Sequence, residues 1–146
     1  MKSEPVSYSI EHLKRDVVTP WSGIRNYQSR NFMRDEMRKG DGVLFYHSSC
    51  REVGVAGTAE VASTPYPDAT QFDRKSDYYD PKATKEHPRW MLVDVRFVKQ
   101  FKQVIPLTAL RRENSLRNLM ILRPGNRLSI TPVTREEFRT ILSLAS

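Results

Sequence analysis

Residues 43–62 read VLFYHSSCREVGVAGTAEVA and hold two apolar runs separated by a short polar stretch. Val43–Ser48 and Val53–Ala62 both have the β-branched and aromatic composition that is typical of strands. Two strands joined by so short a connection predict an antiparallel hairpin. Gly54 and Gly57 in the second strand indicate a bulge, a curved sheet or close backbone packing.

Further strands and helices are expected on both sides of this hairpin. Before it, the pattern predicts a short helix capped by Ser9 and continuing to Val17, then a second helix at Tyr27–Met37. After it, the expected elements are a strand at Trp90–Val98, helices at Pro106–Arg112 and Ser115–Leu119, a strand at Arg127–Thr131, and a final helix that opens on the capping box Thr134–Glu137. Helices and strands do not alternate regularly. We therefore expect an α+β fold built on a small, curved, mainly antiparallel β-sheet or barrel with peripheral helices.

Residues 63–89, between the hairpin and the next strand, are expected to form a long irregular loop. They hold four prolines and four aspartates. Loops of this length in a compact domain are often functional. Four aromatic side chains are expected to pack the loop as an ordered flap, namely Tyr66, Phe72, Tyr78 and Tyr79.

The length of 146 residues predicts one domain over residues 1–146. The single cysteine, Cys50, excludes an internal disulfide and a cysteine-cluster zinc site. The sequence has neither a secretory signal nor an apolar run near the roughly 18 residues of a membrane span. We therefore expect a monomeric protein without membrane contact, cytoplasmic in a bacterium and nuclear in a eukaryote.

The basic charge is concentrated in the second half of the chain. The formal net charge is +7, of which residues 1–73 contribute −1 and residues 74–146 contribute +8. Residues 96–139 hold eight arginines and two lysines against three glutamates. A basic surface is typical of proteins that bind a polyanion such as DNA or RNA, although an ordinary solvated surface is the alternative.

No pattern in the sequence predicts a catalytic or metal site. His47 and Cys50 are three residues apart, a spacing that does not bring a Cys–His pair into hydrogen-bond contact on a strand. The three histidines, His12, His47 and His87, lack metal-ligand spacing, and no glycine-rich phosphate-binding motif occurs. We expect neither a metal nor another cofactor.

Flat rings and short polar side chains occur together at the ends of several expected elements. Examples are Trp21 with Ser22, and Tyr46 with Ser48. Rings can stack on a planar base while polar groups bind its edge. Core aromatics beside helix caps would give the same pattern, so both interpretations stay open on the pattern alone.

Several motifs in order resemble the EVE domain: MKSEP at 1–5, PWSGIRNYQSRN at 20–31, KGDGVLFYHS at 39–48, GVAG at 54–57, YYDPK at 78–82 and PRW at 88–90. The resemblance covers residues 2 to about 142. It implies a PUA-like fold, a curved and mainly antiparallel β-barrel with helices around it. It also implies kinship with the YTH domain, a reader of methylated adenine in RNA. On this resemblance, the expected ligand is a modified base of DNA or RNA, with 5-methylcytosine the usual suggestion, and no catalytic activity is implied.

The resemblance also implies a base-binding pocket. Its expected residues are Lys2, Ser3, Trp21, Asn26, Tyr46, His47, Ser48 and Trp90. Trp21 is expected to form a stacking wall, and Ser3 and Asn26 to bind a base edge. Strand alternation puts Tyr46 and Ser48 on one face and His47 on the other, so one of the three is expected to be structural, with His47 the first to exclude. The expected phosphate contacts are Arg25, Arg30, Arg111, Arg112 and Arg127.

Two further functions stay open at this point. The first is an enzyme acting on a modified nucleobase or another small planar ligand, for which Glu4, His47 and Asp94 are the candidate acid–base groups. The second is an adaptor whose basic half docks on acidic protein. Product formation would favour the enzyme, and salt-sensitive binding of nucleic acid would count against the adaptor.

Overall fold

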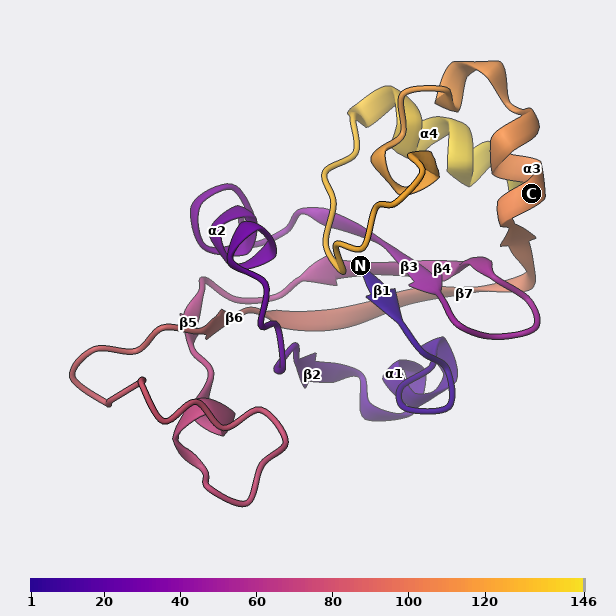
Figure 1. The fold of residues 1–146 in the computed structure, drawn as a ribbon. Helices are drawn as coiled ribbons and strands as arrows, with labels where there is room; N and C mark the ends of the chain where they lie inside the picture. The colour runs from indigo at the N-terminus through magenta and orange to yellow at the C-terminus, as the bar shows by residue number, and fades with distance from the viewer. Residues whose placement is uncertain (146) are drawn as a thin grey trace.

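The hairpin lies in the middle of a five-stranded curled sheet, described here over residues 1–145 of a computed structural model (Figure 1). The elements are β1 Lys2–Ser3, α1 Ile10–Asp16, β2 Val18–Pro20, α2 Tyr27–Asp35, β3 Gly42–His47, β4 Gly54–Val61, β5 Tyr66–Pro67, the 3-10 helix η1 Ala69–Phe72, β6 Met91–Leu92, β7 Asp94–Pro106, α3 Leu107–Arg112, the 3-10 helices η2 Asn114–Leu116 and η3 Met120–Leu122, and α4 Arg135–Leu144. The strand order is β1-β3-β4-β7-β2, and β5 pairs with β6 in a small separate sheet.

The predicted hairpin is confirmed, because β3 and β4 pair antiparallel. The only parallel pair of the described strands is β1 with β3. Gly57 lies where β4 meets β7, and a Cβ atom there would stand 2.2 Å from the carbonyl oxygen of Lys99. The register of β4 against β7 shifts at this point, so the glycine permits both the close approach and the irregularity.

The predicted helix at the start of the chain is confirmed with one correction. Ser9 caps α1 and accepts a hydrogen bond from the N–H of His12. The helix ends at Asp16, so the expectation that Val17 continues it is wrong. Val17 has φ 69°, its N–H closes the last turn onto Leu13, and its side chain is 58% exposed. This positive-φ residue ends the helix and turns the chain into β2.

The strand predicted at 90–98 is divided in the structure: Met91–Leu92 forms β6 of the small sheet, and β7 begins at Asp94 and continues to Pro106, so that its 13 residues reach from β2 to α3. The strand predicted at Arg127–Thr131 is wrong. This segment joins β1 only through the Lys2 N–H, which donates to the carbonyl oxygen of Ser129. Ile130 is buried as a strand residue would be, but it is packed from an irregular segment.

Two hydrophobic clusters pack against the sheet. One holds Phe45 and Trp21 with α1 and α2, and the other holds Leu44 and Tyr46 with α3 and α4. Alternate residues of β3 therefore face different clusters. In Figure 1, α1 and β2 lie on one side of β3, β4 and β7, and α3 and α4 on the other. The sequence prediction of a curved, mainly antiparallel sheet with peripheral helices is confirmed.

Candidate nucleic-acid interface

Trp21 stands directly after β2, where its N–H donates to the carbonyl oxygen of Val93 at 2.9 Å. Its ring meets Phe45 and Tyr8 edge-on, with centroid distances of 5.6 and 6.2 Å. The side chain is only 8% exposed. Trp21 is thus a core residue whose ring packs among other aromatic rings.

Three other residues of the expected pocket gather around the same ring contacts. The Ser3 hydroxyl donates to the carbonyl oxygen of Tyr8 at 2.6 Å, and the Ser48 N–H donates to the carbonyl oxygen of Ser3. The His47 ring meets Phe45 edge-on at 5.7 Å. Ser3, Trp21, His47 and Ser48 therefore lie in one neighbourhood, in which Tyr8 joins Ser3 to Trp21 and Phe45 joins His47 to Trp21.

Tyr46 and His47 lie on opposite faces of β3, as expected, but the residue on the Trp21 side is His47 and not Tyr46. His47 shares the Phe45 face and so the Trp21 side, whereas Tyr46 lies in the cluster on the opposite side, among residues of α3 and α4. Alternation separated the two residues correctly. Tyr46 is therefore the residue that lies away from Trp21. The reason is that α1 and α2 pack on the Phe45 and His47 face of β3, and this packing decides which face meets Trp21.

His47 also holds the start of α1. Its Nε2 accepts a hydrogen bond from the N–H of Ile10 at 3.1 Å, and Nδ1 of His12 accepts one from the N–H of Ser9. Both imidazoles must be neutral at these nitrogens to accept. Burial lowers the pKa of His47, although Glu11 opposes this.

The free energy of unfolding is expected to fall as the pH drops below about 6.5. Because the folded-state pKa of His47 is lowered, the unfolded chain takes up the proton first, and stability is lost from about 6.5 downward to the folded pKa. Urea titrations at several pH values in this range should show that the free energy of unfolding falls less steeply with pH in His47→Gln than in the parent. The amide oxygen of the glutamine can still accept the hydrogen bond from the Ile10 N–H. His87→Gln, at an exposed position, is the control. If the free energy of unfolding of His47→Gln depends on pH as steeply as that of the parent, His47 is not the group that causes the loss of stability.

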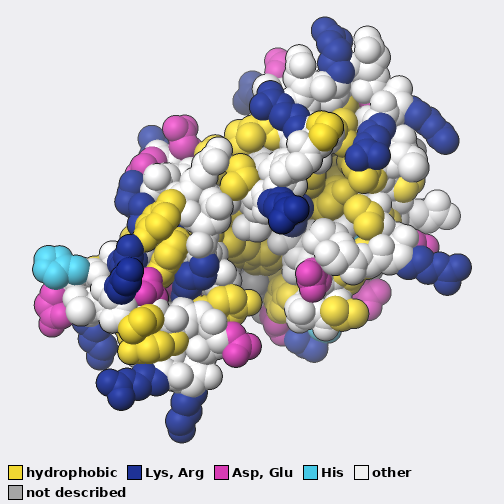
Figure 2. Space-filling model, in the orientation of Figure 1, with side chains coloured by type: hydrophobic (Ala, Val, Ile, Leu, Met, Phe, Trp, Pro, Cys, Tyr) yellow, Lys and Arg dark blue, Asp and Glu magenta, His cyan; other side chains and the backbone are white. Residues whose placement is uncertain are grey.

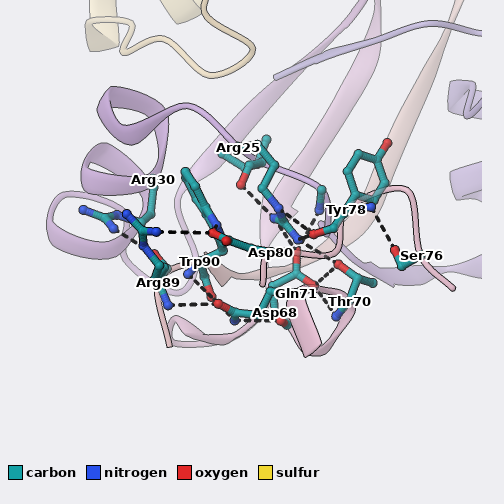
Figure 3. Close-up of polar contacts among 12 residues, drawn as sticks. Arg25, Arg30, Asp68, Thr70, Gln71, Ser76, Tyr78, Asp80, Arg89 and Trp90 are labelled. Carbon is teal, nitrogen blue, oxygen red and sulfur yellow. Dashed lines mark hydrogen bonds and ion pairs between the residues drawn. The ribbon is translucent and has the colours of Figure 1, made fainter. Parts of the chain in front are cut away.

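A second neighbourhood begins two residues after Trp21 and joins the long loop to α2 (Figure 3). Gly23 has φ 88°, and the ring of Tyr78 packs where a Cβ would stand, so a side chain is excluded at this position. The Gly23 N–H donates to Oδ2 of Asp68 at 2.8 Å. Asp68 is fully buried and also accepts bonds from the N–H and hydroxyl of Thr70. The loop thus fixes the segment that carries Trp21.

Arg25 belongs to this support. Its five hydrogen bonds go to the carbonyl oxygens of Ile24 and Tyr78, the hydroxyl of Thr70 and Oδ2 of Asp68. A guanidinium has five N–H donors, so none is left for a phosphate in this arrangement. The placement therefore favours a structural role over the expected phosphate contact.

Trp90 and Asn26 also lie in this second neighbourhood. Trp90 is 5% exposed, stacks on Tyr27 at 4.8 Å, and donates from Nε1 to Oδ2 of Asp80. The guanidinium of Arg25 lies 5.3 Å from the centre of its ring. Asn26 caps α2 by accepting from the N–H of Ser29. The structure does not bring Trp90 to Trp21, and its ring is occupied by its own neighbours.

Of the two expected phosphate contacts beside the Trp21–Asn26 segment, Arg25 and Arg30, it is Arg30 that keeps free donors. It bonds to the carbonyl oxygen of Arg89 and to Asn31, and has no acidic partner among residues 1–145. Burial lowers the pKa of Arg30, and the neighbouring positive charges of Arg34 and Arg89 add to the shift. Its guanidinium lies 4.6 Å from the centre of the Tyr27 ring. An anion at this place would relieve the charge repulsion.

The remaining expected contacts lie elsewhere. Arg111 and Arg112 end α3, which follows the Pro106 end of β7, whereas β2 and Trp21 lie at the Asp94 end. Arg127 is exposed in the segment after η3. Lys2, on the edge strand β1, is partly exposed and pairs with Tyr46 in register. The arginines near the Trp21–Asn26 segment are therefore Arg30 and Arg89 rather than those of α3.

Sequence reasoning missed the residues that support the site. Tyr8 links Ser3 to Trp21, and Asp68 anchors Gly23 across 45 positions. Gln71, fully buried, accepts from the N–H groups of Arg89 and Trp90. Only the four-aspartate composition of the loop could have drawn attention to Asp68.

The candidate acid–base groups do not converge. The Nε2 of His47 is engaged by Ile10, and the carboxylate of Asp94 accepts a hydrogen bond from Tyr66 at 2.5 Å. Glu4 is exposed in the turn after β1. Within residues 1–145, no cluster of three potential metal ligands occurs and no helix is long and apolar enough to cross a membrane.

Comparison with known proteins identifies several similar chains. The EVE domain model matches residues 1–144. Human thymocyte nuclear protein 1 is 43% identical over 99% of this chain and 72% of its own length. A crystal structure from Pseudomonas putida superposes with a TM-score of 0.96 at 44% identity and covers 100% of this chain and 97% of that one. A crystal structure of human THYN1 in complex with 5-methylcytosine-containing DNA superposes with a TM-score of 0.91 at 42% identity, covering 99% of this chain and 95% of that one.

Proposed function

The chain belongs to the EVE domain family, and from this we propose that it reads nucleic acid by taking a modified base, 5-methylcytosine in DNA first, into a pocket at the Trp21–Asn26 segment, without chemistry on the base. The observation that carries this proposal is the likeness to human THYN1, whose structure holds 5-methylcytosine-containing DNA. The likeness extends over nearly the whole chain, which supports the same kind of binding here.

The proposed pocket uses the ring of Trp21 and the polar groups around Ser3, His47 and Ser48. Stacking on an aromatic ring contributes about 1–3 kcal/mol per base, which offsets the few kcal/mol that unstacking costs. Because Trp21 is only 8% exposed, base entry requires a small outward movement of the exposed Ser22 and its neighbours. Asp68 and Arg25 hold the following residues, so the movement is confined to the start of the segment.

A binding screen tests the proposal. Fluorescence anisotropy with labelled single- and double-stranded oligonucleotides should show tighter binding to 5-methylcytosine than to cytosine. Burial of one methyl group predicts a preference of roughly fourfold. RNA oligonucleotides of the same sequences show which backbone is preferred. Equal affinity for both bases would overturn base reading, and release of an altered base, measured by mass spectrometry, would favour an enzyme.

Arg30→Gln is expected to weaken binding to all oligonucleotides alike and to reduce the slope of log K against log salt by about 1. The reason is that Arg30 retains free N–H donors and has no acidic partner among the described residues. Arg112→Gln, at the far end of β7, is the matched control and should leave the slope unchanged. If Arg112→Gln lowers the slope and Arg30→Gln does not, the phosphates bind over α3 instead.

A further inference from the structure

A cavity of about 660 Å³ lies against β3 and is covered mainly by α4, with Leu110 of α3 and with Phe32 and Met37 from the α2 side also in its lining. Its walls are mostly apolar and include Val55, Leu119, Ile121, Phe138 and Ile141. Figure 2 shows hydrophobic side chains gathered in a hollow of this face, with Lys and Arg side chains around it. The volume falls within the roughly 300–1,000 Å³ that is common for small-molecule sites.

The cavity also holds polar groups that lack partners. Tyr46 lines it, and its hydroxyl, which reaches solvent, has no hydrogen-bond partner within residues 1–145. Arg135 and Arg139 line it from α4, and neither has an acidic partner in the described part of the chain. Asp41 is the only acid in the lining, and its Oδ2 accepts from the N–H of Arg38.

These polar groups stand at two ends of an apolar wall. The ring of Phe138 lies over Gly42, which places the start of α4 at the beginning of β3. Tyr46 is four residues further along the same face of β3, or about 13 Å at strand spacing. The arginine pair and the Tyr46 hydroxyl are therefore separated by the length of the wall formed by Leu44 and its neighbours.

We propose that this cavity binds an amphipathic carboxylate. Its carboxylate pairs with Arg135 and Arg139, its apolar body lies along β3, and a second polar group at its far end accepts a hydrogen bond from Tyr46. Unpaired guanidinium groups select an anion, and the apolar wall selects a chain or ring body over a nucleotide. The site is distinct from the proposed nucleic-acid interface, because Ser3, Trp21, His47 and Ser48 do not line the cavity.

Isothermal titration calorimetry with dodecanoate, 12-hydroxydodecanoate and 1-dodecanol tests whether the cavity requires a carboxylate and accepts an apolar chain. The parent should bind both carboxylates and bind dodecanol more weakly. The double variant Arg135→Ala/Arg139→Ala should weaken carboxylate binding roughly tenfold and leave dodecanol unchanged. Arg117→Ala, an exposed arginine outside the lining, is the control. No dodecanoate binding by the parent, or equal binding by the double variant, would overturn the proposal.

Tyr46→Phe tests the proposed hydrogen bond at the far end of the ligand, and Ile121→Trp tests whether the ligand occupies the cavity. The parent should prefer 12-hydroxydodecanoate to dodecanoate, and Tyr46→Phe should remove that preference while retaining dodecanoate binding. Ile121→Trp should fill the cavity and abolish binding of all three probes, with its fold checked by circular dichroism. A preference that persists in Tyr46→Phe overturns the role of its hydroxyl, and full binding by folded Ile121→Trp overturns the location.

Discussion

Trp21→Ala is expected to lower the free energy of unfolding by about 3–5 kcal/mol, the range typical of removing a large aromatic side chain from a core. Trp21 is 8% exposed and packs edge-on against Phe45 and Tyr8, so the deletion leaves a cavity between β2, β3 and the start of α1. Urea denaturation measures the change. An unaltered midpoint and slope would contradict the placement of Trp21 in the core.

The same variant is expected to lose the preference for 5-methylcytosine, and a control must separate this loss from the loss of stability. Phe45→Leu removes a neighbouring ring that is fully buried and out of reach of a base. It should lower stability and keep the preference. Both variants are measured at a temperature where circular dichroism shows them folded. If Phe45→Leu loses the preference as fully as Trp21→Ala does, the effect comes from general loosening and not from Trp21.

Local patterns were sufficient to predict the elements whose signals lie within a few residues. The β3–β4 hairpin and the capping residues Ser9 and Thr134 are in this group. The extension of β7 beyond Val98 had no such signal, because four of the five residues from Lys99 to Gln103 are polar and only Phe101 is apolar and buried. The segment at Arg127–Thr131 had a strand-like composition but meets β1 through a single hydrogen bond from the Lys2 N–H and forms no ladder with it.

The candidate site was predictable where its residues adjoin in sequence and not where they meet through packing. The sequence predicted a role for the Trp21–Asn26 segment, but nearness in sequence did not distinguish Arg25 from Arg30. The difference arises because the loop brings Asp68, Thr70 and the Tyr78 carbonyl to Arg25 and leaves Arg30 at the surface of α2. Similarly, alternation could separate Tyr46 from His47, but only the packing of α1 decides which of them lies beside Trp21.

Asp68 is the residue on which the support of the segment depends. Its two carboxylate oxygens accept from the Gly23 N–H, the Arg25 guanidinium, and the N–H and hydroxyl of Thr70. Burial by itself would raise the pKa of the carboxyl, but the bonds from Thr70, Gly23 and Arg25 outweigh it and leave the pKa below its ordinary value. The carboxylate is therefore charged in the folded state and fully satisfied.

Asp68→Asn is expected to lower the free energy of unfolding by about 3–5 kcal/mol at pH 7, as the breaking of a buried ion pair does. The amide of the asparagine has only one acceptor oxygen, so its NH₂ group must face one of the donors that now bind the second carboxylate oxygen. In addition, the Arg25 guanidinium loses its counter-charge. The parent keeps this stability above the unfolded pKa near 3.9 and loses it as the pH falls through the lower folded pKa, so the two proteins should converge in acid. Asp73→Asn is the matched control, because Asp73 is exposed in the same loop and, within residues 1–145, its carboxylate accepts only from the Lys75 N–H. Equal urea midpoints for the two variants at pH 7 would show that Asp68 does not anchor the segment.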